Sequence, residues 1–275
     1  MKPRRFDYVR PDSAEEAVAV LAEYGEAASV LAGGQSLMAM LNLRLAEPVV
    51  LIDITSLKEL DYVRHAGNTI EVGAAVTQNR LKEWPELTTK LPLLAAALPF
   101  VGHFQTRNKG TVCGSVAHAD PSSEIPLVLA TLGGEVVLRS LRGTRVLAAV
   151  DFQCGALATA REPDELIEAV RFPVQPTGQV AFREVARRHG DFAIIAVAAC
   201  VEDGTAMRIG VGGVADRPAT RRGRIEDAAA AEDFFESLAW ELEGYDDQHA
   251  CARLRRDLLR RIGPVVVEEA LRCAA

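Results

Sequence analysis

Two short glycine-containing turns constrain this chain more than any other feature. They are residues 32–36 (AGGQS) and residues 111–115 (TVCGS), and an apolar run lies beside each. Glycine lets backbone N–H groups approach a ligand without a Cβ atom in the way. Successive N–H groups form an anion-binding nest, and Ser and Thr hydroxyls add donors. Either turn alone is also typical of an ordinary loop. Together they predict a ligand with two linked phosphates, and we first expect a dinucleotide.

The composition is that of a globular protein with a sizeable core. The chain has 275 residues, of which 49% are hydrophobic, enough for one large or two to three small domains. Its net charge of −7 argues against binding to nucleic acid, which needs a basic face. We interpret the arginine-rich runs at 221–224 and 253–261 as solvated helix faces.

No targeting or membrane segment is expected. The longest apolar run, residues 193–201, is far shorter than the roughly 20 residues that span a bilayer, and no apolar core follows the basic N-terminus. The five cysteines are odd in number and lack metal-ligand spacing, which predicts reduced thiols and no iron–sulfur or zinc site in this chain. We therefore expect a cytoplasmic protein without a transmembrane segment.

The N-terminal part is predicted to be a small α/β unit. Ser13 and Glu16 have the spacing of a capping box, and the helix that follows should end at Gly25. A strand at 28–31 then runs into the first glycine turn. A short helix at 37–45 and a buried strand at 49–54 complete the unit.

The rest of the chain is predicted to be α+β. In the middle part we expect strands at 69–74, 134–140, 144–150 and 165–172, and helices at 91–98 and 123–133. Two prolines and a glycine at 173–178 mark the clearest boundary. Beyond it we expect a three-stranded antiparallel sheet at 179–187, 193–201 and 206–214, and helices near 225–239, 249–261 and 264–273.

Local chemistry gives few catalytic candidates. Ser36 lacks the following glycine of a nucleophile elbow, and neither turn has the glycine triplet of a Rossmann motif. His118 and Asp120 could form an acid–base pair, but such neighbours more often make a loop interaction. We predict no catalytic side chain and no metal ligand.

The amino-acid sequence around the two turns resembles that of a known family. Segments 31–54 and 107–126, together with FDYVRP at 6–11 and GDFAII at 190–195, resemble the FAD-binding medium subunit of molybdenum hydroxylases. This type includes carbon monoxide dehydrogenase, quinoline oxidoreductase and nicotine dehydrogenase, and it corresponds to the flavin domain of xanthine dehydrogenase. The resemblance implies a vanillyl-alcohol-oxidase-type flavin fold, with FAD between subdomains 1–56 and 57–173 and a C-terminal domain, 179–275, over the flavin.

The resemblance also implies a set of cofactor-binding residues. The FAD diphosphate would lie between the two turns, Glu124 near the adenosine ribose, Leu166 near the isoalloxazine edge, Arg187 near its pyrimidine side, and Phe192 stacked on the flavin. The diphosphate would be bound by Gly33, Gly34, Gln35 and Ser36 on one side and by Thr111, Gly114 and Ser115 on the other. Four neighbouring residues are also implied to bind the cofactor: Ala32, Leu37, Thr106 and Gly110.

Three positions depart from the family pattern. Cys113 replaces a glycine in the second turn and would place a thiol beside the phosphates. Gln35 stands where many relatives have His, a change that keeps hydrogen bonding. Phe192 stands where close relatives have Tyr, so it keeps the ring and loses the hydroxyl.

The implied function is an electron relay. A large partner subunit would hold the molybdopterin centre, a small partner would hold two [2Fe–2S] clusters, and this chain would pass electrons through FAD to an external acceptor, within a dimer of heterotrimers. One alternative is a stand-alone flavin-dependent reductase or oxidase, for which His118 or His189 would be the acid–base candidates. A second alternative is an adaptor that lost the flavin, which Cys113 motivates.

Overall fold

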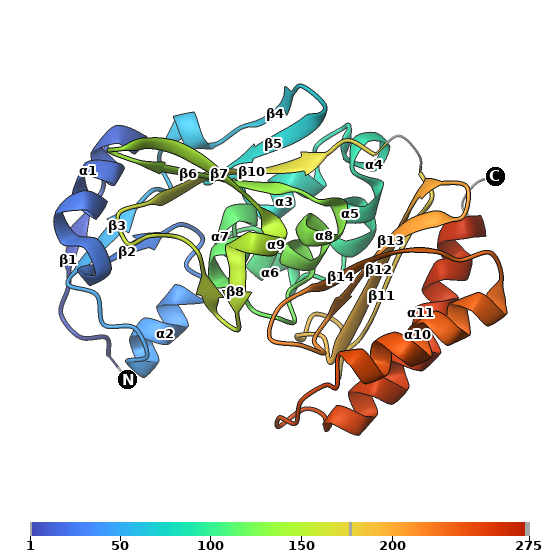
Figure 1. The fold of residues 1–275 in the computed structure, drawn as a ribbon. Helices are drawn as coiled ribbons and strands as arrows, with labels where there is room; N and C mark the ends of the chain where they lie inside the picture. The colour runs from blue at the N-terminus through green and yellow to red at the C-terminus, as the bar shows by residue number, and fades with distance from the viewer. Residues whose placement is uncertain (1, 176–177, 273–275) are drawn as a thin grey trace.

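The first sheet carries the first glycine turn. The computed structural model describes residues 2–175 and 178–272. Strands β1 (Asp7–Val9), β3 (Val50–Asp53) and β2 (Ala28–Leu31) form a parallel sheet in that spatial order (Figure 1). Parallel pairing needs crossover connections, which contain α1 (Ala14–Tyr24) and α2 (Leu37–Leu43). The turn at 32–36 therefore lies at the carboxyl end of β2, where ligands bind in open α/β sheets.

Helix α1 begins and ends as its sequence predicts. Ser13 Oγ accepts a hydrogen bond from the Glu16 N–H at 3.1 Å. The Glu16 carboxylate accepts from the Asp12 N–H at 2.8 Å, one residue before the donor of a capping box. Gly25 ends the helix with φ of 52° and leads into η1 (Gly25–Ala27). The buried face consists of Ala14, Ala17, Val18 and Leu21.

The second sheet is antiparallel and has five strands. Their order is β4 (Val63–Ala66), β5 (Thr69–Gly73), β10 (Leu166–Pro173), β6 (Glu135–Ser140) and β7 (Gly143–Ala148). The short helix η2 (Lys58–Leu60) precedes this sheet. Short helices and one small strand pair connect its strands: α3 (Gln78–Lys82), α4 (Leu87–Lys90), α5 (Pro92–Ala97), α6 (Phe104–Arg107), α7 (Val112–His118), α8 (Glu124–Leu132), α9 (Ala149–Phe152), β8 (Gln153–Gly155) and β9 (Ala158–Thr159). Helices α7 and α8 pack against β10.

The third sheet has one strand more than predicted. Its antiparallel order is β11 (Val180–Val185), β12 (Ile195–Asp203), β13 (Ala206–Gly212) and β14 (Ala219–Arg224). The prediction of three strands is wrong because β14 contains the arginine run 221–224, which we interpreted as a helix face. Exposed charges are typical of an edge strand, where they oppose pairing with other chains.

One long helix replaces the last two predicted helices. After α10 (Ala228–Glu241), α11 (Ala252–Arg272) continues through Pro264. A proline inside a helix removes one backbone hydrogen bond. The helix persists because Leu259, Val266 and Val267 on both sides of Pro264 are buried in one apolar cluster.

The third sheet is covered on both faces (Figure 1). Helices α5 and α8 pack against one face, and α11, with α10 beside it, packs against the other. Along β12, Ala196, Ala198 and Cys200 join the core of the preceding parts, whereas Ile195 and Val197 join the cluster under α10 and α11. Burial on both faces explains why this strand is a continuous apolar run. Among the described residues, no helix is both long and apolar enough to cross a membrane.

Candidate functional site

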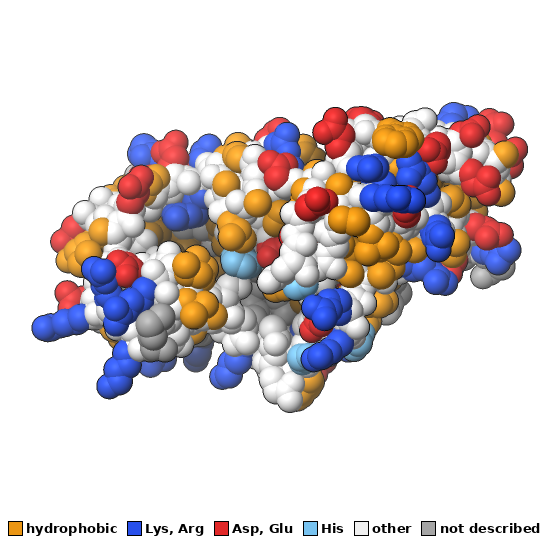
Figure 2. Space-filling view, turned by 90° about the horizontal axis from the view of Figure 1, so that it is seen from below, with side chains coloured by type: hydrophobic (Ala, Val, Ile, Leu, Met, Phe, Trp, Pro, Cys, Tyr) orange, Lys and Arg blue, Asp and Glu red, His pale blue; other side chains and the backbone are white. Residues whose placement is uncertain are grey.

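Both glycine turns open into one cleft of about 630 Å³, a size within the range of small-molecule sites. Its walls come from β2 and the start of α2, from α7 and the start of α8, from the start of β10, and from the loop before β12. Figure 2 shows, from below, a hollow in this face of the molecule, with histidine atoms at its edge. The fold thus brings together segments that are more than 150 residues apart in the chain.

The first turn presents unused backbone donors. In the part of the chain that the structure describes, the N–H groups of Gly33, Gly34, Gln35 and Ser36 donate to no other protein group. Gly34 has φ of 68°, and its carbonyl oxygen accepts from the Met38 N–H at 3.1 Å. The Ser36 side chain does not cap α2. Four consecutive free donors at a cleft wall are the arrangement that an anion-binding nest requires, and anion binding there stays a prediction.

The first turn presses against the segment just before the second turn, residues 109–110. A Cβ atom at Gly33 would lie 2.6 Å from the Gly110 Cα and 2.8 Å from the Lys109 carbonyl carbon. The 110–112 segment is itself held by the Gln78 N–H on the Gly110 oxygen at 2.8 Å and the Val112 N–H on Val76 at 3.1 Å. Only glycine allows this backbone approach at position 33. The first turn has the donor set that a diphosphate needs, because its four residues line the cleft and their N–H groups have no acceptor in the described structure.

The second turn differs from the predicted nest. It is the capped start of α7, in which Thr111 Oγ1 accepts from the Gly114 N–H at 3.0 Å. The Ser115 N–H donates to the Thr111 carbonyl oxygen at 3.2 Å. These two N–H groups are therefore engaged within the helix, which leaves the Ser115 hydroxyl as a donor on the cleft wall. The prediction of free successive N–H groups is wrong for Gly114 and Ser115.

The Cys113 thiol is bonded to the second sheet. Its Sγ donates to the Val72 carbonyl oxygen of β5 at 3.5 Å, and the side chain is buried. Burial raises the pKa of this thiol to about 12, so it stays protonated. The residue occupies the second position of a helix and has no positive φ. The cysteine is thus a buried residue that lines the cleft at the start of α7, while its thiol is bonded to β5.

Glu124 is a buried carboxyl group at the start of α8. It is 6% exposed, and burial, with a smaller contribution from the charge of Asp120, raises its pKa to about 7. The Glu184 carboxyl of β11 is also affected: burial first and the charge of Glu124 second raise its pKa to about 8. Glu124 lines the cleft, where its oxygens can accept bonds from hydroxyl groups.

The predicted residues of the turns, Glu124, Leu166 and Phe192 line the cleft. Phe192 is 59% exposed, so its ring is accessible from the cleft that it lines. Arg187 does not line the cleft and lies exposed after β11. Its predicted position near the flavin stays a prediction. The full set of predicted residues that line the cleft is Ala32, Gly33, Gly34, Gln35, Ser36, Leu37, Thr106, Gly110, Thr111, Gly114, Ser115, Glu124, Leu166 and Phe192.

The sequence did not point to three polar residues of the cleft. Gln78 is 5% exposed, and its Oε1 has no hydrogen-bond partner in the described structure. Arg161 and Glu165 precede β10. No local motif marks any of them. His118 also lines the cleft, but Asp120 accepts from the Ser122 N–H at 2.8 Å and no bond joins these two candidates in the described structure.

The comparisons with known proteins agree with this geometry. The chain matches the family described as FAD binding domain in molybdopterin dehydrogenase over residues 4–175. The caffeine dehydrogenase subunit beta of Pseudomonas sp. (strain CBB1) is 44% identical over 196 residues, which are 70% of this chain and 66% of that subunit. The nicotine 6-hydroxylase medium subunit of Paenarthrobacter nicotinovorans is 34% identical over 273 residues, 95% of this chain and 96% of its own.

A solved structure matches the whole chain. It is the carbon monoxide dehydrogenase from Hydrogenophaga pseudoflava that lacks the Mo-pyranopterin moiety of the molybdenum cofactor, with a TM-score of 0.94 and 30% identity over 100% of both chains. The family match covers well over half of the chain, and the resemblance of the two turns is confirmed. The chain therefore belongs to the family of FAD-binding domains of molybdopterin dehydrogenases.

Proposed function

We propose that this chain is the FAD-binding, electron-transferring medium subunit of a heterotrimeric molybdenum hydroxylase. A large subunit would hold the molybdopterin cofactor and a small subunit two [2Fe–2S] clusters, and the complex would be a dimer of heterotrimers. Bound FAD supplies the redox chemistry, accepting electrons from the clusters and passing them to an external acceptor. The relatives' subunit names support this assignment.

The observation that carries the proposal is the row of free N–H groups at 33–36, pressed against the segment at 109–110. A diphosphate brings two negative charges and several acceptor oxygens, which these donors and the hydroxyls of Ser36 and Ser115 would bind. The cleft lies between the proposed subdomains 1–56 and 57–173. Residues 179–275, through Phe192, would cover the flavin.

The remaining residues would bind and orient FAD without proton chemistry on an organic substrate. Glu124 would accept from the ribose hydroxyls, and the Phe192 ring and Leu166 would contact the flat isoalloxazine. His118 and Asp120 provide no preformed acid–base pair, because no bond joins them in the described structure and the Asp120 carboxylate accepts from the Ser122 N–H instead. A stand-alone flavoenzyme remains the second candidate, because His118 lies on the cleft wall.

Purification of the full chain with added FAD tests the proposal. We expect flavin absorption bands, no substrate turnover by the chain alone, and turnover when the two partner subunits are co-expressed. Turnover by the isolated chain would favour the stand-alone flavoenzyme. A folded chain that stays colourless at saturating FAD would contradict flavin binding altogether.

A further inference from the structure

Arg161 is the sole Lys or Arg among the described residues that line the cleft. It lies between β9 and β10, five residues before Leu166. No motif marked it, and the arginine predicted to contact the flavin, Arg187, lies outside the cleft lining. An inference about Arg161 rests on the proposed function, because the ligand in question is FAD.

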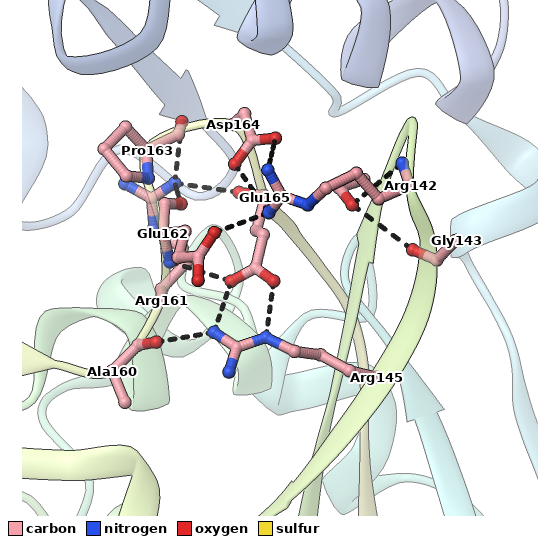
Figure 3. A network of polar contacts seen from close by, with 10 residues as sticks. Arg142, Gly143, Arg145, Ala160, Arg161, Glu162, Pro163, Asp164 and Glu165 are labelled. Carbon is pink, nitrogen blue, oxygen red and sulfur yellow. Dashed lines mark hydrogen bonds and ion pairs between the residues drawn. The ribbon is translucent and has the colours of Figure 1, made fainter.

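One edge of the Arg161 guanidinium is fixed to the backbone of its own loop (Figure 3). Its Nη1 lies 2.8 Å from the Glu165 carbonyl oxygen, 3.0 Å from that of Glu162 and 3.3 Å from that of Pro163. Within the described structure, its Nε and Nη2 have no hydrogen-bond partner. One nitrogen, Nη1, therefore holds the guanidinium in place, and the N–H groups of Nε and Nη2 can donate to a ligand.

The carboxylates around Arg161 are already paired with other arginines (Figure 3). The Glu165 carboxylate binds Arg145 through two bonds of 2.5 and 2.8 Å. Arg142 lies 2.5 Å from Glu162 and 2.7 Å from Asp164. No ion pair of the described residues includes Arg161. Burial lowers the pKa of its guanidinium, while the charges of Glu165 and Asp164 raise it, and arginine remains protonated in proteins.

We propose that Arg161 donates hydrogen bonds to an oxygen of bound FAD and is the cationic contact of this cleft. A partly buried guanidinium whose N–H groups lack acceptors costs free energy, and a ligand oxygen that accepts from them removes that cost. FAD offers two suitable acceptors, the diphosphate and the carbonyl-bearing edge of the isoalloxazine. The interaction is the same in both cases, a charge-assisted hydrogen bond from the guanidinium to an oxygen atom.

Three variants of the full chain test this proposal: R161Q, R161K and, as a control in the same loop, R142Q. Arg142 pairs with the same loop but does not line the cleft. For each we would measure the dissociation constants of FAD and ADP, the midpoint potential of bound FAD and the thermal midpoint. R161Q should bind FAD about tenfold more weakly. R161K should recover part of the loss, and R142Q should match the wild type.

The dissociation constants and the midpoint potential together show which of the two FAD oxygens Arg161 contacts. If Arg161 contacts the diphosphate, R161Q weakens ADP and FAD together and leaves the potential unchanged. If it contacts the isoalloxazine, ADP affinity is unchanged and the potential falls, because a positive charge favours the reduced anionic flavin. Wild-type FAD affinity and potential in R161Q, or an equal affinity loss in R142Q, would overturn the inference. Failure of the wild-type chain itself to bind FAD would instead overturn the proposed function.

Discussion

Replacement of Gly33 by alanine should separate the first glycine turn from the segment at residues 109–110. The φ of Gly33 is not positive, so alanine meets no backbone strain at this position. The conflict is steric, because the new Cβ would lie 2.6 Å from the Gly110 Cα, whereas ordinary contact begins at 3.4 Å. A displacement of at least 0.8 Å, and more at the Lys109 carbonyl oxygen, which is nearer still, must come from backbone movement, since no flexible side chain can yield there.

The cost of this displacement sets the expected loss of affinity. Overpacking of this kind costs about 1–3 kcal/mol. If the two segments part in the free chain and must close again on FAD, the dissociation constant rises about 5- to 150-fold, at roughly 1.4 kcal/mol per factor of ten. If they do not part, the same cost appears as a lower thermal midpoint. The two effects share one steric origin.

Titration of FAD against the flavin-free chain, followed by flavin fluorescence, measures the first effect, and thermal unfolding measures the second. Gly178→Ala is the matched control, because its Cβ meets nothing within 4 Å and its φ is not positive. Gly34→Ala separates strain from packing: its φ of 68° costs about 1 kcal/mol, and its Cβ meets only side chains, at 3.2 Å. A Gly33→Ala chain that matches Gly178→Ala in both assays would refute the reasoning.

Three further predictions concern single side chains. Phe192→Ala should leave the stability of the flavin-free chain unchanged, because the ring is 59% exposed, and should weaken FAD binding roughly tenfold by calorimetric titration; unchanged affinity would exclude stacking. Glu124 has a pKa raised to about 7 by burial, so the folded state keeps a proton that the unfolded state loses above about pH 4.5. The wild type should therefore lose about 3 kcal/mol relative to Glu124→Gln as the pH rises from 4.5 to 7, measured by urea unfolding of the flavin-free chain, and parallel pH profiles would contradict this. In thiol labelling at pH 8 with peptide mapping, the exposed Cys154 and Cys251 should react in the native chain and the buried Cys113 and Cys200 only after unfolding; native labelling of Cys113 would disprove its place in the core.

Elements with local signals were predictable. The cap at Ser13, the stop at Gly25 and the apolar run of β12 each depend on neighbouring residues, and the structure has them. Strand β14 was missed because its arginines conceal the alternation of an edge strand, and its pairing with β13 is not a local property. The break expected before Pro264 did not occur, because tertiary packing of α11 outweighs one lost hydrogen bond.

The order of residues along the chain was sufficient to identify the glycine turns, the family and fourteen of the residues that line the cleft. The other residues that line the cleft with those turns could be identified only from the fold. Gln78 and Arg161 reach the same cavity as the nest at 33–36 from separate elements, and the Cys113 thiol turns into the core behind its helix. Backbone conformation at a glycine turn is decided by adjacent residues, whereas the partners of a polar side chain depend on which distant segments the sheets bring together. The bond of the Cys113 thiol to Val72 and the position of Arg161 in the cleft are consequences of that packing, whereas the engaged N–H groups of α7 follow from its local cap at Thr111.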